Sequence, residues 1–128
     1  MATANEGEQP VAASTVAIVE DVTSHPASPI KEIATRTGLA QSLVSRTVER
    51  LRGRGVFTVS HDPADGRRTL VRVNTRTRIV DFGQRGERPI ADAIRRVVPG
   101  VTDQQRRRIE AALDVLGRQL LDKSDRQP

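Results

Sequence analysis

The 128-residue sequence contains no cysteine, tryptophan or tyrosine, and only two phenylalanines. Without cysteine there can be no disulfide bond or thiolate metal site, and two isolated histidines do not make a zinc site. The scarcity of aromatic residues argues against a large pocket for a flat cofactor, so we expect neither metal nor cofactor. The core must be built from Val, Ile, Leu and Ala, which suits a helical protein with short strands.

No hydrophobic run approaches membrane-spanning length, and the acidic start MATANEGEQP lacks the positive charge and apolar run of a signal peptide. Together with the lack of cysteine, this predicts a soluble cytoplasmic protein without membrane contact. A chain of this length with 36% hydrophobic residues can bury one core. We expect disordered polar ends at residues 1–9 and 122–128 around a single domain over residues 10–121.

Positive charge is concentrated in the middle of the chain. Residues 1–45 carry a net charge of −3, residues 46–80 carry +6, and residues 81–128 carry +2. All nine basic residues of the middle segment are arginines, whose planar guanidinium suits bidentate contacts with phosphate and guanine. A charge run is also typical of a solvated surface, so charge alone leaves nucleic-acid binding open.

Two short helices joined by a glycine turn are predicted just before and within this basic segment. Pro10 can begin a first helix that ends at SHPASP. Ser28 and Pro29 then have the features of a helix start, a capping hydroxyl followed by proline. Gly38 permits a sharp turn into a helix over about residues 40–52, and this pair is a helix-turn-helix candidate.

The second helix of this pair has two different faces. Its buried face is predicted by apolar residues at helical spacing: Val44, Val48 and Leu51. Its opposite face carries polar residues: Ser42, Ser45, Arg46 and Glu49, with Gln41 nearby. Short hydroxyls beside an arginine can approach base edges closely, which suits DNA reading, and the alternative is a serine-rich surface helix without that function.

A β-hairpin is predicted directly after these helices. Phe57 and Val59 alternate with polar residues, as do Thr69, Val71 and Val73 beyond the turn HDPADGRR. The turn carries two arginines at its tip. A hairpin that follows a helix-turn-helix is the layout of a winged helix, and the combination is far more specific than either part.

Two longer helices are predicted to complete the chain. The first extends from Asn74 to about Val98, and a capping box formed by Thr102 and Gln105 begins the second. The second has an apolar stripe made of four residues: Ile109, Leu113, Leu116 and Leu120. The stripe predicts either an interface with a partner subunit or packing against the chain's own domain.

Residues 29–78 resemble the winged-helix regulators of the MarR family. The resemblance rests on SLVSRTVERLRGRG as the recognition helix and DPADGRRTLV as the wing, and VTDQQRRRIEAALDVLGRQL resembles the family's last helix. It implies an α+β, mostly helical fold, with a DNA-binding core over residues 29–78 and helical dimerisation over residues 79–121. It also implies a homodimer on a pseudo-palindromic site in double-stranded DNA, with recognition helices in major grooves and wing arginines in minor grooves.

The resemblance implies a role for individual residues. Those placed at base edges or nearby phosphates lie on the recognition helix: Gln41, Ser42, Ser45, Arg46 and Arg50. On the wing, Arg67 enters the minor groove, and Asp65 pairs with Arg67 and directs its side chain. Arg68 and Arg72 contact either phosphates or nothing. The dimer interface is the stripe of Ile109, Leu113, Leu116 and Leu120.

Two features depart from the family pattern. Ala40 stands where the family often has a capping hydroxyl, and the first helix is short for a family whose first helix contributes to the dimer and the ligand pocket. A small-molecule effector is therefore a less secure partner than DNA.

We therefore expect a sequence-specific transcription regulator, a repressor, and not an enzyme. The sequence has no paired carboxylates, nucleophile–base set, metal set or phosphate loop. The alternative is a winged-helix interaction module whose basic face docks an acidic protein. Salt-sensitive binding to random duplex DNA distinguishes the two, because neutralising phosphates releases counterions.

Overall fold

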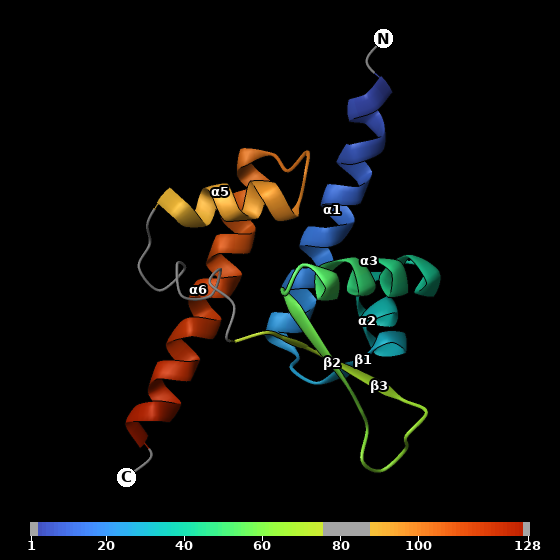
Figure 1. Ribbon diagram of the computed structural model, residues 1–128, viewed down its shortest axis with the longest axis vertical. Coiled ribbons are helices and arrows are strands. Elements are labelled where there is room, and N and C mark those ends of the chain that lie inside the picture. The colour runs from blue at the N-terminus through green and yellow to red at the C-terminus, as the bar shows by residue number, and fades with distance from the viewer. Residues whose placement is uncertain (1–2, 76–87, 127–128) are drawn as a thin grey trace.

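The computed structural model describes residues 3–75 and 88–126, with side chains described over 11–75 and 91–118. The elements follow in this order: α1 (Thr3–Ser24), β1 (Ser28–Pro29), α2 (Ile30–Thr37), α3 (Gln41–Gly53), β2 (Phe57–His61), β3 (Thr69–Val73), α5 (Arg88–Val97) and α6 (Asp103–Arg126). In Figure 1 the β2–β3 hairpin projects away from α2 and α3, while α5 lies beside α6. The expected mostly helical α+β winged-helix fold is confirmed.

The predicted helix-turn-helix is formed by α2 and α3. Its turn depends on Gly38, which has a positive φ of 75° and donates its backbone N–H to the carbonyl of Ala34 at 2.9 Å. A residue with a side chain would be strained in this conformation, so glycine suits the position. The predicted buried face of α3 is confirmed by three side chains no more than 2% exposed: Val44, Val48 and Leu51. Ala40 precedes α3 without a side-chain cap, as its methyl group requires.

The three strands form one antiparallel sheet in the order β1-β3-β2. The predicted hairpin is confirmed, with Val59 of β2 opposite Val71 of β3. Val71 is also paired with Ser28 of β1 and is fully buried. The sequence did not predict β1, because a strand of two residues has no detectable alternation.

The role expected for Ser28 is wrong. Pro29 has extended backbone angles (φ −68°, ψ 151°), so α2 begins at Ile30 and has no side-chain cap. The hydroxyl of Ser28 donates instead to the carbonyl of His25 at 2.6 Å. Since Ser28 pairs with β3, its backbone geometry is set by the sheet and not by the helix that follows.

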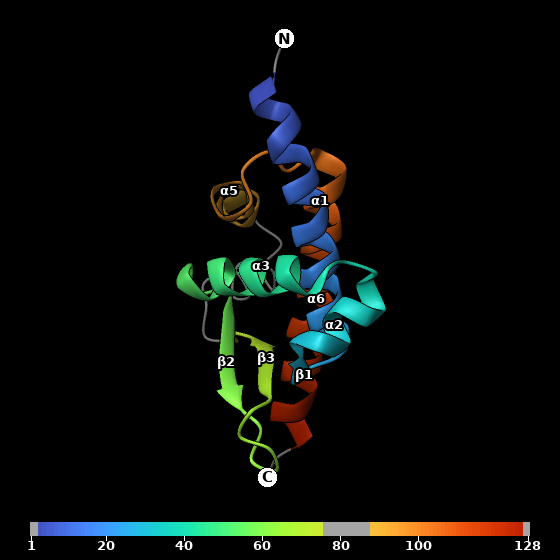
Figure 2. The same cartoon turned by 90° about the vertical axis from the view of Figure 1, so that its right-hand side faces the viewer.

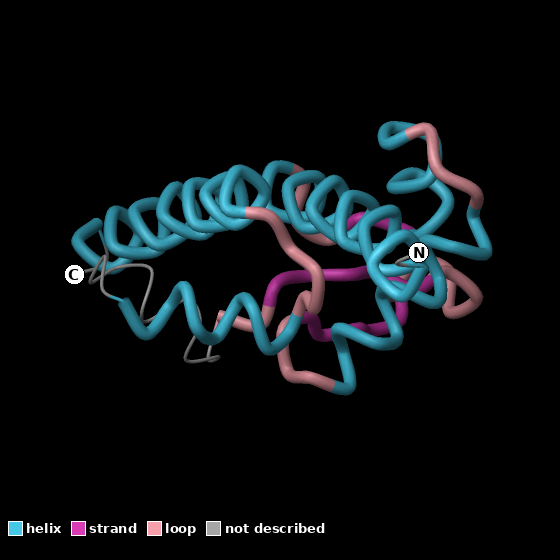
Figure 3. Tube along the Cα trace, turned by 90° about the horizontal axis from the view of Figure 1, so that it is seen from above, coloured by secondary structure: helices cyan, strands magenta, loops and turns pink. Residues whose placement is uncertain are grey.

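The long helices α1 and α6 pack against each other and complete one core with α2, α3, α5 and the sheet. Figures 2 and 3 show α1 and α6 adjoining, with the strands along one side of them. An ion pair links the two helices at the surface, where Nε of Arg108 donates to Oε2 of Glu20 at 3.0 Å. Because α1 also contacts α2, α3 and β3, it connects α6 to the winged-helix part of the chain.

The expected helix limits need correction at both ends of the chain. The first helix begins at Thr3 instead of Pro10, and α6 continues to Arg126, so residues 3–9 and 122–126 are helical and not disordered. Polarity was a poor guide here because Glu, Gln and Lys are good helix formers and a solvated helix end needs no apolar residues.

The helix predicted from Asn74 is also different. Residues 76–87 of that prediction lie outside the described residues, and the next described helix, α5, begins at Arg88. Asn74 extends the hairpin, since its backbone N–H donates to the carbonyl of Val56 at 2.8 Å and its amide donates to the carbonyl of Gly55 at 3.0 Å. The capping box is confirmed, because the backbone N–H of Gln105 donates to the Thr102 hydroxyl at 3.1 Å and the reverse bond measures 2.9 Å.

The apolar stripe of α6 serves the chain's own core. Ile109, Leu113 and Leu116 are 4%, 2% and 9% exposed and belong to the single core cluster. The side chain of Leu120 lies outside the described set. Because Ile109, Leu113 and Leu116 are already buried in the chain's own core, they cannot also form the surface of a dimer interface. Of the two alternatives, packing of the stripe against the chain's own domain is the one that agrees with the burial of these three residues.

Candidate nucleic-acid interface

The outer face of α3 presents polar groups to solvent. Four predicted contact residues are exposed there: Gln41, Ser42, Ser45 and Arg46. In the described part of the chain, none of these four side chains makes a hydrogen bond or an ion pair, whereas Glu49 on the same helix is paired with Arg52 at 2.8 Å. The donors and acceptors of the four are thus available to a ligand.

The tip of the wing is shaped by two aspartates that bind backbone amides. The Asp62 carboxylate accepts from the backbone N–H of Ala64 at 2.9 Å, and the Asp65 carboxylate accepts from the backbone N–H of Arg67 at 3.1 Å. The expected pairing of Asp65 with the Arg67 side chain is therefore wrong in detail. Asp65 holds the main chain of the turn, because a short side chain bonds most easily to an amide two residues further on.

The three wing arginines differ in their partners. Arg67 is exposed at the tip, and its guanidinium has no partner among the side chains described over residues 11–75 and 91–118. Arg68 donates to Glu32 of α2 at 2.9 Å, and Arg72 donates across the hairpin to the Ser60 hydroxyl at 2.8 Å. Among the described contacts, Arg68 and Arg72 are thus committed to partners within the chain, and Arg67 is not.

A surface groove brings the predicted residues of α3 and the wing together. It has a volume of about 770 Å³ and lies between α2, α3 and the loop that precedes β3. Its lining includes four of the predicted contact residues: Gln41, Ser45, Arg67 and Arg68. A second hollow of about 430 Å³ continues it beside Ser45 and Arg46. Ser45 of α3 and Arg67 of the wing, which are more than 20 positions apart in sequence, thus line the same groove.

Arg50 does not belong to this surface. Its Nη2 donates to the Thr15 hydroxyl of α1 at 2.6 Å, and its Nη1 donates to the carbonyl of Val97 at the end of α5 at 3.2 Å. Burial, together with the nearby charge of Arg54, lowers the pKa of Arg50 below its usual value. The expected contact of Arg50 with DNA is therefore wrong. Arg50 instead links α3 to α1 and α5, because its position on α3 directs it toward those helices.

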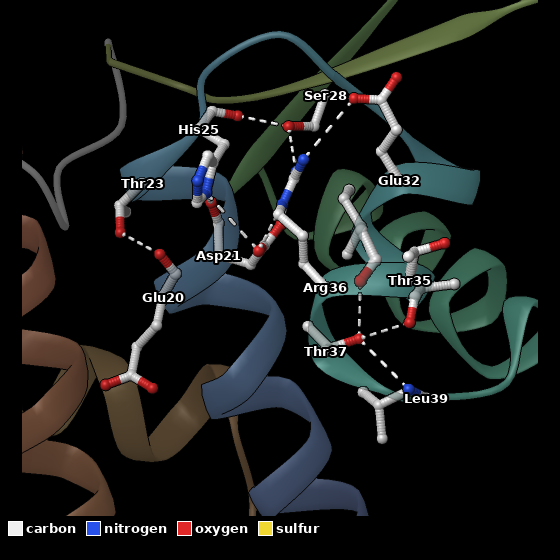
Figure 4. A network of polar contacts seen from close by, with 12 residues as sticks. Glu20, Asp21, Thr23, His25, Ser28, Glu32, Thr35, Arg36, Thr37 and Leu39 are labelled. Carbon is white, nitrogen blue, oxygen red and sulfur yellow. Dashed lines mark hydrogen bonds and ion pairs between the residues drawn. The ribbon is translucent and has the colours of Figure 1, made fainter.

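Sequence reasoning missed a polar network at the edge of the groove, shown in Figure 4. Arg36 of α2 donates two hydrogen bonds to the Asp21 carboxylate of α1, at 2.8 and 2.9 Å, and a third to the Ser28 hydroxyl at 2.6 Å. The bond to Asp21 is the main reason why the pKa of Arg36 is raised. The spacing of Glu32 and Arg36 was visible in the sequence, but the contact with Asp21 depends on how α1 and α2 pack.

Two further searches cover only the described ranges. No helix there combines the length and apolar character needed to cross a membrane. Nor do those ranges contain a group of three or more His, Cys, Asp or Glu side chains arranged for a metal ion.

Comparison with known proteins identifies the fold in this chain. Residues 11–77 match the family model described as winged helix DNA-binding domain. A probable transcriptional regulator from Pseudomonas aeruginosa is 25% identical, with a TM-score of 0.50 over 80% of this chain and 76% of its own. The PcaV transcriptional regulator from Streptomyces coelicolor is also 25% identical, with a TM-score of 0.48 over 87% and 74%.

The structure of MarR is 21% identical to this chain, with a TM-score of 0.48 over 89% of this chain and 76% of its own. None of the curated proteins compared with the chain matches its sequence.

Proposed function

Because the chain belongs to the family of winged helix DNA-binding domains, we propose that it is a MarR-type transcription regulator that reads double-stranded DNA with α3 in the major groove and the wing in the minor groove. The observation that carries this proposal is the groove of about 770 Å³ in which Gln41 and Ser45 of α3 face the same space as Arg67 of the wing. A reading helix and an arginine tip on one surface match two adjacent grooves of a duplex.

The uncommitted polar groups of α3 support a role in base reading. Ser45 and Arg46 are exposed and have no partner in the described part of the chain, so neither must break an internal contact before it binds a base edge. Arginine recognises guanine through a bidentate hydrogen bond in the major groove, and serine can donate to or accept from several bases. The buried stripe on the other side of α3 keeps these side chains directed outward.

The wing supports the minor-groove contact. The Asp65 carboxylate holds the backbone of Arg67 in the turn, and no described side chain pairs with the guanidinium. A narrow minor groove has an enhanced negative potential that attracts such a group. An exposed arginine on a turn held by side-chain-to-backbone bonds loses little main-chain freedom on binding.

The homodimer and the pseudo-palindromic operator are part of the same proposal. One α3 helix reads about half a site, and two copies related by a twofold axis read two half-sites. Because Ile109, Leu113 and Leu116 of the α6 stripe are already buried in the core, the dimer contact is assigned to the outer faces of α1 and α6. Among the described side chains, Val11 of α1 and Val115 of α6 are the large apolar ones that are exposed there, at 45% and 52%.

Repression follows from occupancy of the operator. A dimer that fills two major grooves and the flanking minor grooves denies that stretch of duplex to other proteins. A protein that acts in this way works in the compartment that holds the DNA, which agrees with the cytoplasmic location expected from the sequence.

An effector is not assigned to the apolar cavity between the terminal helices and α3. This cavity, lined in part by Val19, Leu51 and Ile94, has a volume of about 20 Å³. Pockets for small molecules measure about 300–1,000 Å³, so an effector would have to separate these helices first. The proposal therefore includes no small-molecule effector.

Selection of binding sites from random duplex DNA, combined with a mass measurement in solution, tests the proposal. We expect an inverted repeat to be enriched and the mass to be that of a dimer. Replacing Ser45 or Arg46 with Ala should cost about 1–3 kcal/mol on the selected site and much less on random DNA. Arg52→Ala, on the same helix but paired with Glu49, is the matched control. Failure to bind any duplex in a salt-dependent manner would favour an interaction module that docks an acidic protein.

A further inference from the structure

Five charged side chains form a chain of alternating sign from α1 to the wing. Asp21 binds Arg36, Arg36 lies 3.6 Å from Glu32, and Glu32 binds Arg68 at 2.9 Å. Arg68 also lies 3.8 Å from Asp62 in the turn of the wing. Three carboxylates thus surround two guanidiniums, so this chain of charges has a formal net charge of −1 although it borders a surface proposed to bind DNA.

Neighbouring wing arginines are therefore in opposite situations. Arg67 and Arg68 both line the groove, together with Glu32. The guanidinium of Arg68 lies between two carboxylates, whereas that of Arg67 has no partner among the described residues. A phosphate can bind Arg67 directly, but it must compete with Glu32 for Arg68.

The carboxylate of Glu32 is positioned to compete with a phosphate for Arg68. Its carboxylate lies near Arg36, whose guanidinium is fixed by two hydrogen bonds to the largely buried carboxylate of Asp21 and one to Ser28. Figure 4 shows Arg36 reaching from α2 toward Asp21, with Glu32 one helical turn away. Glu32 and Arg68 are each about half exposed, so their contact can be exchanged for a phosphate when DNA arrives.

We propose that Glu32 is a positioning residue that holds Arg68 away from phosphates and so limits the affinity of the free protein for DNA without an operator. This rests on the proposed placement of the groove against DNA. Binding to random sequence depends almost entirely on contacts between cations and phosphates, so one arginine fewer weakens it directly. A regulator must find its operator among a large excess of other sites, and weak binding to those sites favours this search.

The experiment measures binding of the full chain to a random-sequence duplex at several salt concentrations, by fluorescence anisotropy. With Glu32→Gln, Arg68 gains a phosphate contact. The expected result is roughly threefold to eightfold tighter binding at about 0.1 M salt, and a slope of log affinity against log salt that is steeper by about 0.9.

Glu49→Gln is the matched control, because it removes the same charge from an exposed glutamate whose partner is Arg52 and not Arg68. The Glu32→Gln change should exceed this control. It should also vanish when Arg68 is replaced by Ala, since Glu32 acts through that side chain. Thermal melting of each variant confirms that the fold is retained.

Two results would overturn the inference while the proposed function stands. One is a Glu32→Gln variant that binds like the parent or like Glu49→Gln. The other is tighter binding by Glu32→Gln that persists in the Arg68→Ala background, which would make the carboxylate's own repulsion the cause. A parent protein that binds no duplex at any salt concentration would instead remove the proposed function, and the inference with it.

Discussion

The guanidinium of Arg50 on α3 donates a 2.6 Å hydrogen bond to the hydroxyl of Thr15, a fully buried residue of α1. The same guanidinium reaches the last turn of α5 at Val97, and Arg54 reaches the neighbouring carbonyl of Arg96 at 3.1 Å. The free carbonyls at the end of a helix carry partial negative charge, so two arginines there are favourable. The helix proposed to read DNA is thus joined directly to α1 and α5.

Arg50→Met should destabilise the protein. The change keeps the aliphatic part of the side chain but removes both hydrogen bonds, and the expected loss is about 1–3 kcal/mol of the free energy of unfolding. Arg52→Met, in which the lost contact is an exposed ion pair, should cost less than about 0.5 kcal/mol. Urea denaturation of the two variants measures the difference. Equal stability would show that Arg50 contributes no more than a surface residue.

Arg67→Ala should weaken DNA binding without changing the melting temperature, because the tip of a hairpin buries little apolar surface. The loss should be larger on operators with A·T-rich flanks than with G·C-rich flanks, since the width and potential of the minor groove depend on those bases. Arg72→Ala, which removes a cation of the same hairpin that is bonded to Ser60, is the control. Unchanged binding of Arg67→Ala on A·T-rich flanks would leave the wing as a solvated turn.

Asp65 offers a way to separate charge from turn geometry. Asp65→Asn keeps an oxygen that can accept the backbone N–H of Arg67, whereas Asp65→Ala loses it. We expect Asp65→Ala to bind the operator more weakly than Asp65→Asn, because a loosened tip must be ordered again on binding. Titration of both variants against one operator at one salt concentration decides this. The reverse order would mean that the carboxylate acts by its charge and not by holding the turn.

Substitutions at adjacent positions of α6 should distinguish the dimer interface from the core. Val115→Asp places a charge on an exposed side chain and should produce a folded monomer. Leu116→Asp places a charge in the core and should destabilise the fold itself by about 3 kcal/mol or more. Light scattering and thermal melting measure the two effects. A folded dimer of Val115→Asp would move the proposed interface to another surface.

The parts of the fold that sequence predicted depend on residues close together in the chain. The buried face of α3 follows from Val44, Val48 and Leu51 at helical spacing, and the turn before it follows from the backbone freedom of Gly38. The capping box at Thr102 and the alternating residues of the hairpin are also local patterns. The exposed face of α3 was predictable for the same reason, because the opposite side of a helix is defined once its buried side is known.

Tertiary structure alone decided which arginines are uncommitted. By composition and spacing Arg50, Arg67 and Arg68 are equivalent members of one basic segment, yet their surroundings differ completely. Arg50 meets Thr15, 35 residues earlier, and Arg68 meets Glu32, 36 residues earlier, while the Arg67 guanidinium meets no partner among the described residues. The same packing buried Ile109, Leu113 and Leu116 of α6 in the chain's own core. The sequence by itself determined local shape and the sign of the charge, whereas the partners of each charge depend on contacts between distant segments, because an ion pair forms only where the fold brings two side chains within a few ångströms.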